Sequence, residues 1–209
     1  MTSRRLVVGI SGASGIVYGV RALQMAREAG VQTHLVVSKA GDITRALETE
    51  LSAAELRALA DVSYSASNVG ASIASGSFRT IGMLIAPCSA NTLCGVARGD
   101  GSNLLTRAAD VTLKERRRLV LMLRETPLSL IHCRAITAVT EAGGIVAPPV
   151  PAFYTGPQSI GEIVDHSVAR ALELLEVDVP MRRWGEPPEW AKTDARAHDR
   201  EPLVERMES

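Results

Sequence analysis

Three short segments of the chain combine small residues with hydroxyl-bearing residues, and each follows an apolar run. They are 11–15, the pair Ser38-Lys39, and 87–92. Small side chains let backbone N–H groups approach an anion, and the N-terminus of a following helix adds positive potential. The second and third segments, taken alone, are more often structural helix caps than binding sites. Together, the three favour a site for a phosphate with its ribose or ribityl chain.

The glycine spacing of the first segment bears on the size of the nucleotide. A G-x-G-x-x-G dinucleotide fingerprint requires a third glycine at a fixed offset, and here that glycine is displaced to Gly19. The segment therefore favours a mononucleotide over a dinucleotide. A plain tight turn between strand and helix is the alternative.

A second group of residues offers positive charge and proton transfer. Arg124 and Glu125 come directly after the apolar run LVLML, and Tyr154 ends a rigid, proline-containing loop. Arg107 and Lys114 are seven residues apart on one expected helix, so they share a face and would clamp a second anion. The alternative for Arg124 and Glu125 is a surface ion pair, which contributes little to stability.

Alternating apolar and amphipathic segments indicate which elements position these residues. Apolar runs predict strands at 6–10, 31–37, 83–86 (ended by Pro87), 119–123 and 145–147. Helical spacing and capping signals predict helices at 17–29, 40–47, 52–60, 93–97, 104–117, 130–141 and 159–175, with 68–78 as loop or short helix. This alternation predicts one α/β domain, a doubly wound parallel sheet covered on both faces. Ligands of such sheets bind at the carboxyl ends of the strands.

Composition limits the class of function. The 209 residues carry 23 basic and 23 acidic side chains, and this zero net charge gives no electrostatic case for binding nucleic acid or an anionic membrane. No window has the length and apolarity of a transmembrane helix or a signal peptide, so we expect a cytoplasmic protein. Three cysteines without a CxxC pair and four scattered histidines predict no metal site. Residues 1–184 are expected to form the domain, and 185–209 a polar, flexible tail.

Several longer motifs resemble one known family. They are GISGASG at 9–15, SKA at 38–40, LETE around Glu48, PCS..TL at 87–93, LLTRAADVTLKERR at 104–117, LVLMLRETPLS at 119–129 and PPVPAFY at 148–154. In this order, from residue 5 to Gly185, they resemble the flavin prenyltransferases, the UbiX family. The most specific part of this resemblance is the run RAADV.LKERR followed by L.RE.P.

The resemblance implies a fold and an activity. The fold is a flavodoxin-like Rossmann fold, a three-layer sandwich that assembles into a large homo-oligomer, typically a dodecamer. The activity joins a dimethylallyl group from dimethylallyl monophosphate to N5 and C6 of reduced FMN, without a metal ion. The product, prenylated FMN, serves a separate decarboxylase. The sequence leaves open a pyrophosphate donor, the pathway and decarboxylase served, the exact oligomer size and the role of the tail.

The same resemblance assigns roles to individual positions. The family binds FMN where this chain has Gly12, Ala13, Ser14, Ser38, Ser89, Ala90, Asn91, Thr92 and Arg124. It holds the prenyl phosphate where this chain has Arg107, Lys114, Tyr154 and Arg170, of which Tyr154 and Arg170 are expected to come from a neighbouring chain. The implied catalytic set is Ser14, Glu48, Lys114, Glu125 and Trp184. Glu48 and Glu125 match acidic residues near the reacting centre, and Trp184 matches the aromatic residue at the prenyl pocket.

One departure from the family motif leaves two alternative functions open. Ala90-Asn91 makes PCSANT resemble the PASANT motif of flavin-dependent cysteine decarboxylases. Those enzymes carry a catalytic histidine shortly after the first strand, whereas the first histidine here is His34. A flavin-dependent decarboxylase of related fold therefore stands as the first alternative. A non-catalytic FMN-binding subunit of a decarboxylase is the second.

Overall fold

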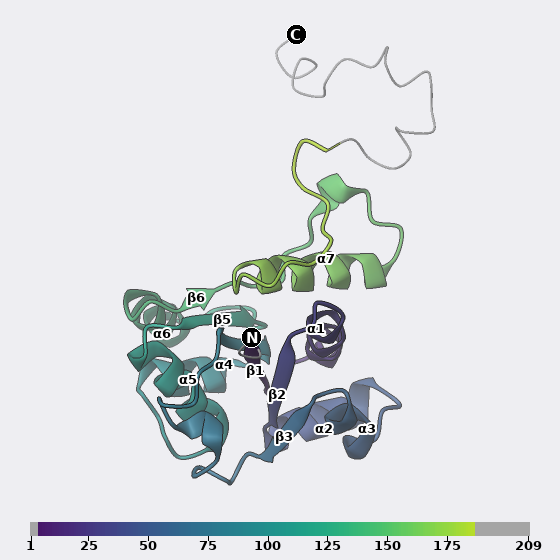
Figure 1. Ribbon diagram of the computed structural model, residues 1–209. Coiled ribbons are helices and arrows are strands. Elements are labelled where there is room, and N and C mark those ends of the chain that lie inside the picture. Colours follow the sequence, from purple (N-terminus) through teal and green to yellow (C-terminus); the bar gives the residue numbers. More distant parts are fainter. Residues whose placement is uncertain (1–3, 187–209) are drawn as a thin grey trace, which may run out of the picture.

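Six parallel strands form one sheet at the centre of the molecule (Figure 1). The structure is a computed structural model and describes residues 4–186. The strands are β1 (Arg5–Ile10), β2 (Gln32–Val37), β3 (Val62–Ser65), β4 (Gly82–Cys88), β5 (Arg118–Leu123) and β6 (Ile145–Val146), in the spatial order β3-β2-β1-β4-β5-β6. The order reverses between β1 and β4, which is the point where α/β sheets of this kind bind ligands.

Helices cover both faces of the sheet. They are α1 (Ile16–Glu28), α2 (Lys39–Glu48), α3 (Ala53–Ala58), α4 (Ala90–Ala97), α5 (Leu104–Lys114), α6 (Leu130–Glu141) and α7 (Ile160–Glu173), with the 3-10 turns η1 (Ser72–Ala74) and η2 (Phe153–Thr155). Successive strand residues point to opposite faces. Leu6, Val8 and Ile10 pack with α1, α3 and α7, whereas Val7 packs with α4, α5 and α6. The predicted doubly wound, three-layer α/β fold is confirmed.

Two predictions about the sheet were wrong. Strand β3 was not predicted, because it is a four-residue edge strand whose side chains are only partly buried and need no apolar run. Pro87 does not end the third predicted strand: β4 continues to Cys88, with irregular pairing to β5 between Ile85 and Cys88. Helix α4 also begins earlier than predicted, because Ser89 caps it.

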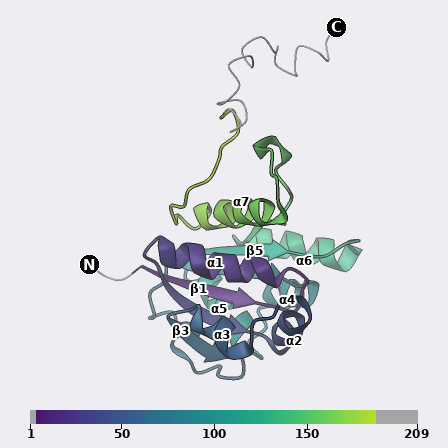
Figure 2. The same cartoon turned by 90° about the vertical axis from the view of Figure 1, so that its right-hand side faces the viewer.

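The region around α7 extends away from the sheet. Helix α7 packs along α1, and both η2 and the chain that follows α7 project beyond it (Figures 1 and 2). Phe153, Ile160 and Trp184 are 75–81% exposed there. Apart from Gly185 and Glu186, which close a turn onto Arg183, the expected tail lies outside the described residues. None of the helices within 4–186 has the length and apolarity needed to cross a membrane.

Candidate active site

Ser11 ties together the turns that follow β1 and β4. Its hydroxyl donates to the Pro87 carbonyl at 2.9 Å and accepts from the Ser89 N–H at 2.8 Å. The side chain is only 1% exposed. A buried hydroxyl that uses both its donor and its acceptor capacity fixes the relative position of the two turns.

Two glycines shape the turn after β1. A Cβ on Gly12 would lie 2.3 Å from the Cβ of Ala40, so only glycine lets this turn approach the start of α2 so closely. Gly15 adopts a φ of +104°, in the region that side-chain-bearing residues avoid. The turn is therefore specified by backbone requirements as well as by any ligand.

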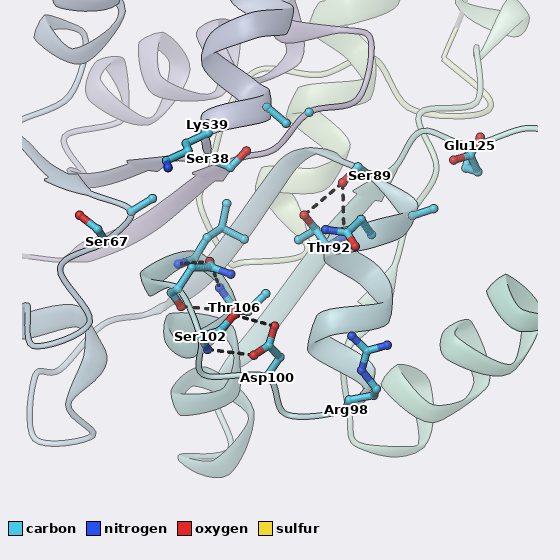
Figure 3. A pocket seen from close by; sticks show the side chains of 17 residues that line it. Ser38, Lys39, Ser67, Ser89, Thr92, Arg98, Asp100, Ser102, Thr106 and Glu125 are labelled. Atoms are coloured by element: carbon cyan, nitrogen blue, oxygen red, sulfur yellow. Dashed lines mark hydrogen bonds between the residues drawn. The ribbon is translucent and has the colours of Figure 1, made fainter.

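Three helix N-termini converge on one cavity of about 650 Å³ at the carboxyl edge of the sheet (Figure 3). Ser38, Ser89 and Asn103 cap α2, α4 and α5, and all three line this cavity. Their side-chain oxygens accept from backbone N–H groups at 3.0–3.3 Å. The positive ends of three helix dipoles therefore face the same space, which is the arrangement that binds a phosphate.

Several residues that line this cavity were absent from the predicted site. They are Ala40, Ala66, Ser67, Arg98, Asp100, Ser102, Asn103, Leu105 and Thr106. Ala66 and Ser67 follow β3, so missing that strand also hid them. Asn103 carries a sequence signal, since an Asn before an apolar helix predicts an N-cap, but only the tertiary structure shows that α5 begins at this edge.

A second cavity, of about 520 Å³, adjoins the first. Ala13, Ser14, Arg124 and Glu125 line it, and it shares Gly12, Ser89 and Glu125 with the first cavity. The Arg124 Nε donates to the Ser14 carbonyl at 3.1 Å, which brings the guanidinium over the turn after β1. Residues predicted from two separate segments are therefore brought together at one edge of the sheet.

Glu48, at the end of α2, caps the start of α1. Its Oε2 accepts from the Gly15 and Ile16 N–H groups at 2.8 and 2.9 Å. Burial is the largest single influence on the pKa of Glu48 and raises it, but hydrogen bonds from Ile16, Ser14 and Gly15, together with the Arg124 charge, lower that pKa overall. The ionised carboxylate thus holds the turn, and its catalytic role stays a prediction.

Tyr154 and Arg170 line a third cavity, of about 240 Å³, between α7 and the end of β5. This cavity shares Pro148 and Pro149 with the second one, so the three cavities lie next to one another in a row. Arg170 pairs with Glu173 of its own helix at 2.5 Å. Within their own chain, Tyr154 and Arg170 thus lie beside the second cavity. Their binding of a second phosphate, and the expectation that a neighbouring chain contributes them, stay predictions.

Arg107, Lys114 and Trp184 line none of the three cavities. Arg107 pairs with Asp110 at 2.8 Å and Lys114 with Glu115 at 2.6 Å. Seven helical residues separate the two cations by roughly 10 Å along the axis, and Lys114 ends α5 at the opposite edge of the sheet from the cavities. The binding of one anion by both cations therefore stays a prediction.

Comparison with known proteins gives the family. The sequence model of the flavoprotein family matches residues 1–172. The flavin prenyltransferase UbiX of Neisseria meningitidis serogroup B is 60% identical over 177 residues, which are 85% of this chain and 94% of the relative. The chain belongs to the UbiX family of flavin prenyltransferases. Solved UbiX structures agree with this assignment.

Two crystal structures are close to this UbiX-family chain. AnUbiX (PadA1), in complex with FMN and dimethylallyl pyrophosphate, has a TM-score of 0.86 and 45% identity and covers 88% of this chain and 99% of its own. A dodecameric FMN-dependent Ubix-like decarboxylase from Escherichia coli O157:H7 has a TM-score of 0.84 and 47% identity, with coverage of 87% and 100%.

The residues of the first two cavities fit FMN. Three capped helix N-termini and the Lys39 ammonium match the charge of its phosphate, and the hydroxyls of Ser38, Ser89 and Thr92 match a ribityl chain. The family match confirms the expectation of a flavin cofactor. Within residues 4–186, no group of three or more His, Cys, Asp or Glu side chains is placed to hold a metal ion.

Proposed function

We propose that the protein transfers a dimethylallyl group from dimethylallyl monophosphate to N5 and C6 of reduced FMN. The observation that carries this proposal is the row of adjoining cavities with a set of groups suited to an anion at each end. Helix N-termini and Lys39 form one set, and Tyr154 and Arg170 form the other. A reaction between two phosphate-bearing molecules requires such a pair of sets around a shared central space.

On the flavin side, the chain binds and orients. Gly12 to Ser14, Ser38, and Ser89 to Thr92 would hold the phosphate and ribityl chain, and Arg124 would lie beside the ring system. Bound reduced FMN supplies the electron-rich N5 and C6 positions that accept the prenyl group. Because these positioning groups are backbone N–H groups and capped hydroxyls, little reorganisation is needed when the flavin binds.

On the donor side, the chain stabilises charge and accepts a proton. The allylic C–O bond breaks with its electron pair on the phosphate, so negative charge grows on the leaving group. Arg170 and the Tyr154 hydroxyl would stabilise that charge. Bond formation at N5 would release the N5 proton. Closure at C6 would consume the double bond of the prenyl group, which gains a proton, while C6 releases one. Glu125, which lines both larger cavities, or the departing phosphate would carry these protons.

Assembly would complete the donor side. Arg107 and Lys114 lie outside the cavities of their own chain, so they would reach a donor phosphate only in the site of another chain. The exposed Phe153, Ile160 and Trp184 offer apolar area for such contacts. We propose a homo-oligomer, a dodecamer as in the Escherichia coli relative, that releases prenylated FMN to a separate decarboxylase in the cytoplasm.

The test is anaerobic incubation of the protein with reduced FMN and dimethylallyl monophosphate, followed by mass spectrometry of the extracted flavin. The expected result is a flavin heavier by one five-carbon unit. A parallel incubation with the pyrophosphate identifies the preferred donor. Unchanged flavin with both donors, from protein that binds FMN, would overturn the proposal in favour of a non-catalytic flavin-binding subunit.

A further inference from the structure

Arg182 joins two loops that carry the aromatic residues of the donor side. One Nη donates to the Thr155 carbonyl at 2.6 Å, and the other donates to the Glu186 carbonyl at 2.7 Å. Thr155 belongs to the η2 turn that presents Tyr154, and Glu186 closes the turn that presents Trp184. A single guanidinium thus connects segments separated by 27 residues on one side and four on the other.

Arg182 and its neighbour Arg183 differ in their interaction partners. Among the described residues, Arg182 makes no ion pair, and its Nε is buried without a hydrogen-bond partner. Arg183, by contrast, is exposed and pairs with Glu173 at 2.6 Å. A partly buried charge that is bonded only to neutral carbonyls is costly to desolvate. The two hydrogen bonds of the guanidinium, and not a counter-ion, therefore fix the position of this side chain.

His166 completes the connection from α7. Its Nε2 lies 3.2 Å from the Arg182 carbonyl and 3.3 Å from the Tyr154 hydroxyl. A carbonyl oxygen only accepts, so Nε2 carries the proton and donates to it. The Tyr154 oxygen then receives the same N–H, and its own proton stays free to donate into the cavity that it lines with Arg170.

Ring contacts extend this arrangement to Trp184. The Tyr154 ring lies edge-on to His166 at 5.7 Å and edge-on to Trp184 at 5.0 Å. Edge-to-face pairs at these distances are stabilising. Trp184 is nonetheless 80% exposed, so its contacts within the chain are few and depend on the turn that Arg182 holds.

We propose that Arg182 and His166 are positioning residues, which together fix Tyr154 and Trp184 for recognition of the donor phosphate. The inference rests on the proposed function, because it takes Tyr154 and Arg170 as the phosphate-binding pair. It adds that His166 sets the direction of the Tyr154 hydroxyl. Arg182 sets the spacing of the two aromatic turns.

The test measures donor binding without turnover. Protein loaded with oxidised FMN, which lacks the electron-rich N5 of the reduced form, is titrated with dimethylallyl monophosphate in a Trp190→Phe background, so that Trp184 is the only tryptophan reporting by fluorescence. We expect His166→Leu and Arg182→Gln to weaken donor binding by about tenfold, the order of one or two lost hydrogen bonds. Both variants should shift the Trp184 emission and leave the affinity for FMN unchanged.

Two controls separate positioning from general damage. His166→Gln keeps an N–H that can reach the same oxygens, so it should restore most of the donor affinity. Arg27→Gln removes another arginine that donates to a carbonyl, far from the cavities, and should change nothing. If Arg182→Gln fails to fold, the His166 pair still decides the question.

A double-mutant cycle gives the decisive result. Because His166 acts through Tyr154, the effect of His166→Leu on donor affinity should largely disappear in a Tyr154→Phe background. Equal effects in both backgrounds, or no effect of His166→Leu at all, would overturn the inference. A wild-type protein that binds the donor but forms no prenylated flavin would instead overturn the proposed function and leave the cycle interpretable.

Discussion

The residues of the cavity proposed to bind FMN and the cations proposed to bind the donor phosphate are held in place differently. Ser38, Ser89 and Asn103 are fixed by backbone N–H groups of the helices that they cap. Arg107, Lys114 and Arg170 are instead 38–56% exposed, and each is paired with a carboxylate of its own segment. The first region is therefore preorganised before a ligand binds, whereas the cations of the second region must leave their carboxylate partners to bind one.

This difference explains how one small chain can treat two phosphates unequally. Exposed ion pairs within a helix contribute little stability, so an incoming phosphate dianion displaces a carboxylate such as Glu173 at low cost. The side chains that cap α2, α4 and α5 carry no charge, so no ion pair has to break at these helix N-termini, and the helix dipoles add to one another. A retained cofactor-like substrate therefore suits the first region, and an exchanging donor suits the second.

Glu125 lines both larger cavities, so its removal should have the largest effect. Glu125→Gln keeps the shape but cannot accept a proton, and we expect prenyl transfer to slow by about 10²–10⁴ with FMN affinity unchanged. Single-turnover absorbance with reduced FMN measures the rate. Glu141→Gln, an exposed glutamate of α6, is the control, and a native rate in Glu125→Gln would remove this residue from the mechanism.

The comparison predicts a split between donor and flavin binding. Lys114→Ala and Arg170→Ala should each weaken donor binding by about 1.5–3 kcal/mol, the value of a charge-assisted contact. FMN affinity, measured by flavin fluorescence, should not change. Arg134→Ala, on the exposed side of α6, serves as the control. If either variant lost FMN instead, the division of the site into two regions would be incorrect.

Gly12→Ala should weaken FMN binding more than donor binding. The added Cβ overlaps Ala40, so the turn after β1 must move, at a cost of about 1–3 kcal/mol. We expect a fall in FMN affinity of that size, while donor affinity of the flavin-saturated protein changes less. Gly161→Ala, whose Cβ makes only ordinary contact with Ser159 at 3.6 Å, should leave both affinities unaltered in the same titrations.

Glu173→Gln should give the smallest effect and sharpen the comparison. It removes the carboxylate that Arg170 and Arg183 share, so the donor phosphate no longer competes for Arg170. Exposed pairs are worth about 0.2–1 kcal/mol, so donor affinity should rise by up to a few-fold. A decrease in donor affinity would show that Glu173 orients Arg170 rather than competing for it.

Most of the fold was predictable because the buried strands are continuous apolar runs. Continuous apolar runs such as LVVGI and LVLML, alternating with amphipathic helical segments, predict a parallel sheet covered on both faces. β3 escaped prediction because its alternating VSYS sequence gains its structure only by pairing with β2. Missing β3 also concealed Ala66 and Ser67, which line the first cavity because β3 pairs with β2.

The sequence by itself determined which residues can bind a phosphate, since small turns, hydroxyl caps and helix starts are local features. It also determined the family, which the comparisons confirmed. The tertiary structure decided which of these residues meet. Asn103 joins Ser38 and Ser89 because α5 starts at the same edge of the sheet, whereas Lys114 ends that helix on the opposite edge. Residue type and spacing describe a helix face, but the direction in which the helix crosses the sheet is set by long-range packing.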